Sequence, residues 1–249
     1  MELQIKNVIE ETCAKLNRPD LFRKPLVGFS SASDEKFGQL KKLIGPWHLT
    51  PKEILPGAES VVSYFVPFTR EVTLAPKSSE HGSSLWAEAY QEINNHFITI
   101  NSAVSGILRE KGYLAESIRP THTYDPADLK CFWSHRSVAV IAGLGAFGAN
   151  RLVITDKGSG GRFCSVITSA PLRSLAAAAE ERCLYHKTGA CRLCFDACPV
   201  KALSPDFFDK FLCQDKLNAN ENLILKQTAL HSADTCGRCI SACPFAYIE

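Results

Sequence analysis

The last quarter of the sequence holds two copies of one cysteine pattern, C-x2-C-x3-C-P, offset by 45 residues. With one upstream cysteine each, the copies provide eight thiols: Cys183, Cys191, Cys194, Cys198, Cys213, Cys236, Cys239 and Cys243. A cubane iron–sulfur cluster is held by four cysteine thiolates, and the x2 spacing lets one tight turn direct two of them at one cluster. The two repeats therefore predict two 4Fe–4S clusters and a protein that transfers electrons.

In two-cluster bacterial ferredoxins, the third cysteine of each repeat binds the other cluster. By that likeness we define quartet 1 as Cys183, Cys191, Cys194 and Cys243, and quartet 2 as Cys198, Cys213, Cys236 and Cys239. The ferredoxin pattern would place a cysteine at position 188, where this chain has Thr188, so Cys183 and Cys213 complete the sets. Paired structural zinc sites also use C-x2-C. The x3 spacing and the C-P endings favour iron.

The remaining composition is that of an ordinary globular protein. The net charge of +2 gives no reason to expect a polyanionic partner. No apolar run is long enough to span a bilayer, and the first ten residues lack the apolar region of a signal peptide. We therefore expect a cytoplasmic protein without disulfides. Of the three other cysteines, Cys13 and Cys164 are expected to pack in the core, and Cys131 lies in a more polar stretch.

Hydrophobic patterns predict an α+β fold that positions these thiols. The expected elements are a helix over 1–16, strands over 25–29 and 61–66, a polar loop over 71–84, a helix over 84–111 ended by Gly112, a helix over 135–142 capped by Ser134 and closed by Gly143, two paired strands over 151–155 and 163–168, and a short helix over 175–179. We place a boundary near residue 175. An α+β cofactor or substrate domain (1–174) is expected before it, and a ferredoxin-like double-cluster domain (175–249) after it.

A glycine-rich turn, Gly143-Leu144-Gly145-Ala-Phe-Gly148, matches G-x-G-x-x-G. A dinucleotide-binding turn needs a helix after its third glycine and an acidic residue about 20 positions further on. Here 149–155 has a strand pattern, so NAD binding is not expected. The glycines instead let backbone amides approach a ligand or form a tight helix-to-strand turn. The loop Gly158–Arg162 allows the same two interpretations.

These segments resemble the epoxyqueuosine reductase family, and more closely its shorter iron–sulfur relatives. The resemblance rests on Ser134-His135-Arg136, Ala142–Gly148, Leu152–Thr155, Gly158–Arg162 and the eight cysteines. It implies a nitroreductase-like, cobalamin-binding type of α/β domain, related to reductive dehalogenases and followed by a ferredoxin-like double 4Fe–4S module that passes electrons to the corrinoid. The cofactor-binding residues that it implies are Ser134, His135, Gly143, Leu144, Gly145, Gly148, Asn150, Gly160 and Arg162.

Three departures from that family shape the expected function. The sequence ends six residues after Cys243, so no tRNA-binding domain is expected. Asn150 stands where the family usually has lysine, and Leu129 stands where it has its catalytic aspartate. The neighbouring Asp125 and Asp128 are the remaining candidates for a catalytic acid.

The resemblance and the cysteines together predict a cobalamin-dependent iron–sulfur oxidoreductase. It would take electrons from a ferredoxin- or flavodoxin-type donor and reduce a small molecule, without a membrane partner. The alternative is an electron-transfer protein that reduces a partner protein or its corrinoid and has no substrate of its own. A purely structural metal protein is a third possibility, which iron and sulfide analysis would decide.

Overall fold

The computed structural model describes residues 1–120, 124–174 and 179–249. Its centre is an antiparallel sheet in the order β1-β2-β6-β3, made of Leu26–Ser31, Ser60–Pro67, Gly161–Thr168 and Ala115–Ser117. All eight residues of β2 are buried, so the sheet is covered on both faces. The predicted mixture of helices and strands is confirmed, and so are the strands predicted over 25–29 and 61–66.

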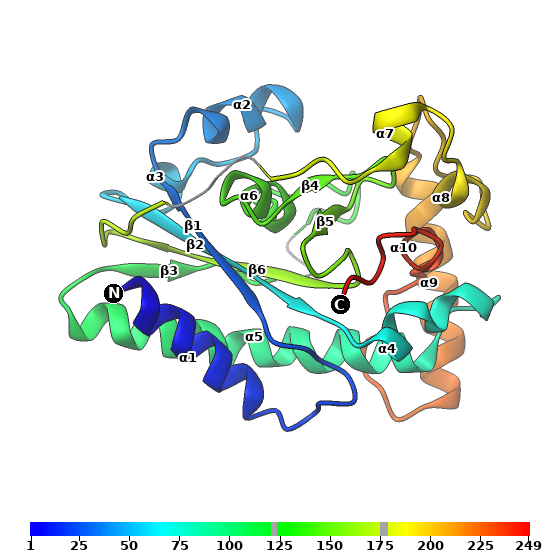
Figure 1. Cartoon of the computed structure of the whole chain (residues 1–249), viewed down its shortest axis with the longest axis horizontal. Coiled ribbons are helices and arrows are strands. Elements are labelled where there is room, and N and C mark those ends of the chain that lie inside the picture. Colours follow the sequence, from blue (N-terminus) through cyan, green and yellow to red (C-terminus); the bar gives the residue numbers. More distant parts are fainter. Residues whose placement is uncertain (121–123, 175–178) are drawn as a thin grey trace.

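Helices α1 (Glu2–Ala14) and α5 (Ser84–Glu110) cover one face of the sheet (Figure 1). The predicted apolar stripe of α5 forms the contact, since Ile93, Phe97, Ile100, Val104 and Leu108 are all fully buried. The helix begins where the Ser83 hydroxyl accepts a hydrogen bond from the Trp86 amide, at 3.3 Å. Its length and position agree with the prediction.

The other face of the sheet carries α2 (Glu35–Leu43), α3 (Pro51–Ile54) and α6 (His135–Ile141). A second apolar cluster joins them to the sheet, with Phe37, Trp133, Val138 and Ile167 among its members. Helix α6 begins as predicted, because the Ser134 hydroxyl accepts a hydrogen bond from the Ser137 amide at 3.2 Å. Gly143 follows the helix in a left-handed conformation, with φ of 74°.

The strand pairing predicted for 151–155 and 163–168 is wrong. Strand β5 (Val153–Thr155) pairs with β4 (Gly145–Phe147) in a separate two-stranded ribbon, and β6 pairs with β2 and β3. A Cβ atom on Gly145 would lie 2.4 Å from the Ile154 carbonyl oxygen, so glycine permits this close ribbon. Strand β6 is long and almost entirely buried, which suits it to the centre of the sheet.

The loop predicted over 71–84 is also partly wrong, because α4 (Arg70–Leu74) and a 3-10 helix η1 (Ala75–Ser78) occupy its first half. Thr69 caps α4, and Val72 and Pro76 are buried, so packing stabilises this polar segment. The short helix predicted over 175–179 falls mostly on 175–178, outside the described residues.

The cysteine-bearing segment contains α7 (Leu184–Thr188), α8 (Leu193–Asp196), α9 (Lys210–Gln227) and α10 (Arg238–Ser241), which lie together at one end of the molecule in Figure 1. The segment packs back on the earlier residues: a Cβ atom on Gly237 would lie 2.7 Å from Pro76. The boundary near residue 175 stays a prediction.

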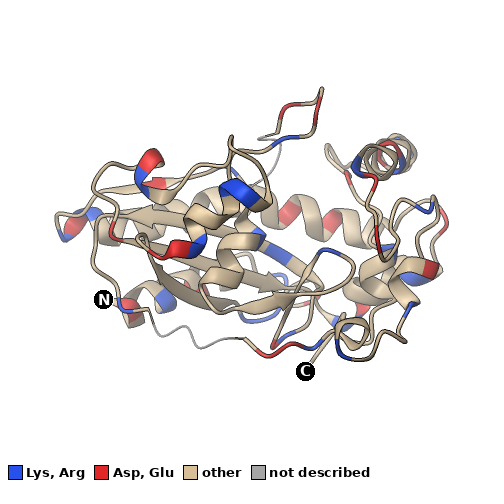
Figure 2. Ribbon diagram, turned by 90° about the horizontal axis from the view of Figure 1, so that it is seen from above, with Lys and Arg blue, Asp and Glu red and all other residues tan. Residues whose placement is uncertain are grey.

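Charged residues of both signs alternate over the helices and loops, while the central sheet is nearly free of them (Figure 2). Among the described residues, no helix combines the length and the apolar character that crossing a bilayer requires.

Candidate metal centres and cofactor site

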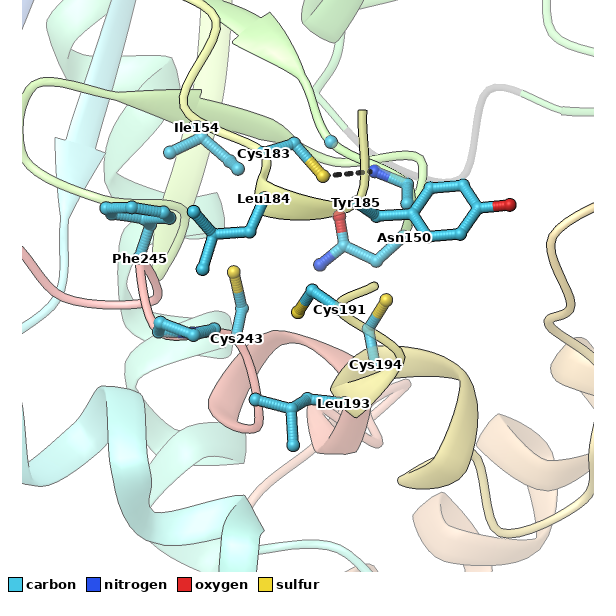
Figure 3. Close-up of a pocket in the computed structure, with 13 residues that line it drawn as sticks. Asn150, Ile154, Cys183, Leu184, Tyr185, Cys191, Leu193, Cys194, Cys243 and Phe245 are labelled. Atoms are coloured by element: carbon cyan, nitrogen blue, oxygen red, sulfur yellow. Dashed lines mark hydrogen bonds between the residues drawn. The ribbon is translucent and has the colours of Figure 1, made fainter. Parts of the chain in front are cut away.

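The four thiols of quartet 1 line one pocket (Figure 3). They come from distant parts of the sequence: Cys183 precedes α7, Cys191 precedes α8, Cys194 lies in α8, and Cys243 follows α10. The backbone of the β4–β5 turn closes the pocket, and the Ala149 amide donates a hydrogen bond to the Cys183 sulfur at 3.4 Å. The last cysteine of the second repeat therefore lies beside the first repeat.

The thiols of quartet 2 act electrostatically on one another. Burial raises the pKa of Cys213 to about 11, with Cys236 and Cys198 adding to the shift. Burial raises the pKa of Cys239 even further, and the sulfurs that add to it include Cys236, Cys213 and Cys198. Cys213 lies in the first turn of α9, which Asp209 caps by accepting a hydrogen bond from the Leu212 amide at 2.9 Å.

In both quartets, burial and neighbouring thiols raise the pKa of at least one cysteine. In quartet 1, burial and then the charges of Cys243, Cys183 and Cys191 raise the pKa of Cys194 to about 11. Four clustered, half-buried thiols cannot all ionise unless a positive group compensates their charge. The chemistry of such donors suits iron–sulfur clusters or zinc.

The spacing of the sulfurs bears on the choice between these two possibilities. Across the described residues, one group of three or more possible metal ligands has all its ligand atoms within 4.8 Å of one another, and it consists of Glu181, Cys183 and His186. No three thiols of either quartet are that close. Since Zn–S bonds of about 2.3 Å put tetrahedral sulfurs about 3.8 Å apart, the quartets are wider than a single zinc ion needs. Glu181 already accepts a hydrogen bond from the Cys183 amide and lies 3.0 Å from His186 Nδ1.

His135, in the first turn of α6, is the clearest candidate ligand-facing residue among those predicted from the resemblance. Its Nδ1 lies 2.8 Å from the Ser165 hydroxyl, which also accepts a hydrogen bond from Trp133 Nε1 at 3.0 Å. Its Nε2 is buried and has no hydrogen-bond partner among the described residues. Burial lowers the pKa of His135 to about 4, so the ring is neutral at physiological pH.

His48, Trp133 and Ser165, which position His135 and α6, were missed by the sequence analysis. His48 is fully buried, and its Nε2 accepts a hydrogen bond from the Ser134 amide at 3.1 Å. Its ring stacks on Trp133, with ring centres 5.9 Å apart. These residues belong to three separate segments, so no local pattern could have joined them.

The protein's own packing accounts for most of the glycines assigned to the cofactor. Gly145 permits the β4–β5 ribbon, and a Cβ atom on Gly160 would lie 2.4 Å from Thr73 Oγ1. Gly143 takes a left-handed conformation, and Leu144 packs against an apolar cluster around Phe65 and Phe163. At Gly148, an added Cβ would touch Ile154 at 3.0 Å. These residues remain cofactor candidates through the resemblance, without an independent sign of a ligand.

Asn150 and Arg162 have defined contacts. The Asn150 side chain is buried, and its Nδ2 donates to the Cys239 carbonyl at 3.2 Å, which ties the β4–β5 turn to quartet 2. Arg162 Nε donates to Asn94 Oδ1 at 3.3 Å, and its guanidinium lies 4.4 Å from the centre of the Tyr90 ring. Arg162 has no carboxylate within 4.0 Å among the described residues, which is unusual for a half-buried cation.

The two candidate catalytic acids lie in an exposed turn. Asp125 Oδ1 accepts a hydrogen bond from the Ala127 amide at 2.9 Å. Asp128 pairs with Lys130 at 2.5 Å, and this contact lowers the pKa of Asp128. An ionised carboxylate held by lysine is a poor proton donor. Lys210, at the start of α9, donates a hydrogen bond to the Asp128 carbonyl at 2.5 Å.

The sequence of the chain was compared with those of known proteins and protein families. No protein-family model matches the chain. The epoxyqueuosine reductase of Bacillus subtilis (strain 168) is 26% identical over 202 residues, which are 76% of this chain and 48% of that protein. The chain therefore spans about half the length of the curated relative it matches.

Solved structures of epoxyqueuosine reductases and reductive dehalogenases have folds similar to that of this chain. A structure of the B. subtilis epoxyqueuosine reductase superimposes with a TM-score of 0.58 and 21% identity, over 97% of this chain and 66% of that one. A catabolic reductive dehalogenase gives a TM-score of 0.61 with 16% identity, over 89% and 30%. A reductive dehalogenase described as B12-dependent gives 0.50 with 16% identity, over 72% and 23%.

The fold thus defines a class of mixed helix-and-sheet proteins that includes epoxyqueuosine reductases and reductive dehalogenases. Within this class, the chain is similar in sequence to the epoxyqueuosine reductase of B. subtilis, which agrees with the resemblance found in the sequence.

Proposed function

We propose that the chain is an iron–sulfur reductase that binds one 4Fe–4S cluster in each cysteine quartet. The grouping of four thiols from distant segments around one pocket carries the proposal. The wide sulfur spacing supports clusters over zinc. In fold terms, residues 1–174 would be the nitroreductase-like, cobalamin-binding type of domain and 175–249 the ferredoxin-like module.

We propose further that a corrinoid binds beside α6 and the β4–β5 turn. The buried Nε2 of His135, for which the described residues provide no hydrogen-bond partner, fits a polar group of such a ligand, for example a corrin amide. A bound corrinoid would supply low-valent cobalt as the reductant of the substrate. The solved reductive dehalogenase described as B12-dependent lends support to this cofactor.

The chain's own residues would hold and orient these groups. Ser165, which accepts a hydrogen bond from Trp133, would orient the His135 ring, burial keeps this ring neutral, and Asn150 fixes the turn against quartet 2. Arg162 provides a positive charge with no acidic partner among the described residues. The ion pair of Asp128 with Lys130 would have to break before Asp128 could donate a proton.

The substrate would be a small molecule, and the donor a ferredoxin- or flavodoxin-type protein in the cytoplasm. A second candidate function is electron transfer to a partner protein, with no substrate of its own. Leu129 at the position of the family's catalytic aspartate, and the ion-paired state of Asp128, favour this alternative.

Anaerobic purification followed by titration with cobalamin tests the proposal. If the purified protein is brown and shifts the spectrum of added cobalamin to the base-off form, the result supports a cobalamin-dependent reductase. Brown protein that fails to bind cobalamin at micromolar concentrations would favour the electron-transfer protein. A His135→Ala variant that binds cobalamin as tightly as the wild type would remove His135 from the site.

A further inference from the structure

The Ser165 hydroxyl determines which nitrogen of the His135 ring carries the proton. Ser165 is buried on β6, and its oxygen accepts a hydrogen bond from Trp133 Nε1 at 3.0 Å. An indole N–H can only donate, so the hydroxyl proton is available for a second partner. The one acceptor in reach of it among the described residues is His135 Nδ1, at 2.8 Å. The opposite arrangement, with a proton on Nδ1, would leave a buried hydroxyl proton without an acceptor.

The neutral His135 ring therefore carries its proton on Nε2, as a donor. Nε2 is buried, and it has no hydrogen-bond partner among the described residues. The Arg119 backbone acts on the ring and raises its pKa, but it completes no hydrogen bond with Nε2. A buried donor without an acceptor is costly, so this position calls for an oxygen atom of a ligand.

Arg162, the second residue of β6, is a cation that is held in place with two of its nitrogens unused. Its Nε donates to Asn94 Oδ1 at 3.3 Å, and its guanidinium lies 4.4 Å from the centre of the Tyr90 ring. Across the described residues, neither Nη1 nor Nη2 has a hydrogen-bond partner, and no carboxylate forms an ion pair with them. A guanidinium oriented in this way can bind both oxygens of one carboxylate or phosphate.

Arg162 and His135 approach each other at an edge of the sheet. Strand β3 pairs with β6 only from Val166 to Thr168, so the edge of β6 from Gly161 to Ser165, here called the open edge, has no strand beside it in the described part of the chain. Successive side chains of a strand point to opposite faces, so Arg162 contacts α5 while the Ser165 hydroxyl contacts His135 of α6. A ligand at the open edge can therefore be reached from both faces. The Arg162 charge helps to lower the pKa of His135, which agrees with their proximity.

A second cation adds to the positive charge near the open edge. Arg136 follows His135 in the first turn of α6, and the Arg162 charge helps to lower its pKa. Its Nη1 donates to the Arg151 carbonyl at 3.1 Å, and no carboxylate among the described residues forms an ion pair with it. Two neighbouring arginines without a counter-anion repel each other, and a bound anion would relieve this repulsion.

The acidic side chains on this side of the molecule have partners of their own. Asp234 and Glu221 act on Tyr124, whose pKa they help to raise. Asp234 accepts a hydrogen bond from Gln214 Nε2 at 3.1 Å, and Glu221 accepts one from the Ala233 amide at 2.8 Å. Neither carboxylate forms an ion pair with the two arginines. The positive charge at the open edge is therefore not compensated by these acids.

We propose that Arg162 and the Nε2–H group of His135 together bind an oxyanion, a carboxylate or a phosphate, at the open edge of β6. This inference deepens the proposed function, and it rests on that function for the source of the anion. The source is either a carboxylate of the small-molecule substrate or the phosphate in the nucleotide tail of a corrinoid. Arg136 adds attraction at longer range. Ser165 is a positioning residue, since it acts on the anion only through His135.

Thermal unfolding in the presence of anions tests the site without any corrinoid. A ligand that binds only the folded protein raises Tm. Anaerobically purified protein is unfolded with sodium benzoate, sodium phosphate or sodium chloride at one pH and one ionic strength. Benzoate or phosphate should raise Tm above the value in chloride. In Arg162→Gln, the dissociation constant obtained from this series should increase about tenfold.

Matched variants separate anion binding from folding. Arg162→Lys keeps the charge but loses the paired nitrogens, so it should retain part of the anion effect. The exposed Arg109→Gln should retain all of it. Ser165→Ala should reduce the rise in Tm relative to its own value in chloride. In ¹⁵N spectra of histidine-labelled protein, His135 should be protonated at Nε2 in the wild type and should show both tautomers in Ser165→Ala.

Cobalamin and cobinamide, which has the corrin ring without the nucleotide tail, distinguish the two sources. If the anion is the phosphate of the tail, Arg162→Gln should weaken cobalamin binding about tenfold and leave cobinamide binding unchanged. If the anion is a substrate carboxylate, Arg162→Gln should abolish the benzoate effect and leave both corrinoids unchanged. The inference is overturned if neither anion raises Tm more than chloride does, or if the arginine variants keep the full effect. Protein without iron, or protein that binds neither corrinoid, would instead refute the proposed function, and the Tm series would still decide whether the anion site exists.

Discussion

The Arg23 side chain binds the C-terminal tail to the first part of the chain, so replacing this side chain should release the tail. Its guanidinium donates hydrogen bonds to three backbone carbonyls: Phe68 at 2.9 Å, Ile248 at 2.6 Å and Lys157 at 2.5 Å. It also lies 4.2 Å from the centre of the Tyr247 ring. The substitution Arg23→Met keeps the aliphatic stem and removes all of these polar contacts.

The expected loss of stability follows from these contacts. A hydrogen bond from a charged donor contributes about 1.5 to 3 kcal/mol, and a cation–π contact about 0.5 to 1 kcal/mol. Water can reach Arg23 and rehydrate the freed carbonyls, so we discount the sum to a loss of about 3 kcal/mol in the free energy of unfolding. For a chain of this size, that loss lowers Tm by about 6 to 12 °C.

The C-terminal tail also lies close in sequence to Cys243 of quartet 1. Its residues hydrogen-bond to the loop before β6, since the Ser159 and Gly160 amides donate to the Ala246 carbonyl at 3.0 and 2.9 Å. Cys243 lies three residues before Ala246, so a released tail should loosen a ligand of quartet 1. The Arg23→Met variant should therefore lose iron from quartet 1 faster than from quartet 2 when a chelator is added.

The assay is urea unfolding followed by circular dichroism, together with iron release to a chelator. Lys24→Met is the matched control: Lys24 is 72% exposed and pairs with Glu10 at 3.0 Å, so its loss should cost less than about 1 kcal/mol. The reasoning would be refuted if Arg23→Met had the same midpoint urea concentration of unfolding as the wild type and released iron at the same rate.

Three further predictions concern the ligands, the buried histidine and the ribbon. Cys194→Ser and Cys239→Ser should each lose about four irons per chain. The double variant Cys194→Ser/Cys243→Ser should lose no more iron than Cys194→Ser alone, because both cysteines belong to quartet 1. Loss of all iron from this double variant would contradict the assignment of Cys243 to quartet 1. The pKa of His135 falls from 6.5 to about 4 on folding, so the unfolded chain binds more protons in this interval and stability falls as pH drops from 6.5 to 4. In His135→Asn, the decrease in the free energy of unfolding between pH 6.5 and pH 4 should be smaller than in the wild type by up to about 3 kcal/mol. If urea unfolding gives the same pH dependence for both proteins, the ring is not buried and neutral. Gly145→Ala should lower Tm because its Cβ meets the Ile154 carbonyl, while Gly106→Ala, in open space on α5, should raise Tm slightly; equal Tm values for the two variants would count against the ribbon.

Local patterns predicted the parts of the structure that depend on local rules. The apolar stripe of α5 and the Ser134 cap of α6 follow from periodicity and hydrogen-bonding chemistry. The two thiol groups follow from repeat spacing and from the exchange of the last cysteine known in ferredoxins, and the structure gathers the four thiols of quartet 1 around one pocket.

Long-range packing decided what the sequence could not predict. Strands β5 and β6 are neighbours in sequence, yet β6 pairs with β2 because its buried residues suit the centre of the sheet. The hydrogen bonds of His48, Trp133 and Ser165 join residues that are 86 and 32 positions apart in the sequence, so no spacing rule reveals them. The glycines of the G-x-G-x-x-G turn were assigned to a ligand, although packing within the ribbon explains Gly145.

Iron and acid-labile sulfide analysis of protein purified without oxygen tests the central claim most directly. Two filled quartets predict about eight irons and about eight sulfides per chain, with a brown protein. Colourless protein that contains about two zinc ions and no sulfide would contradict the account.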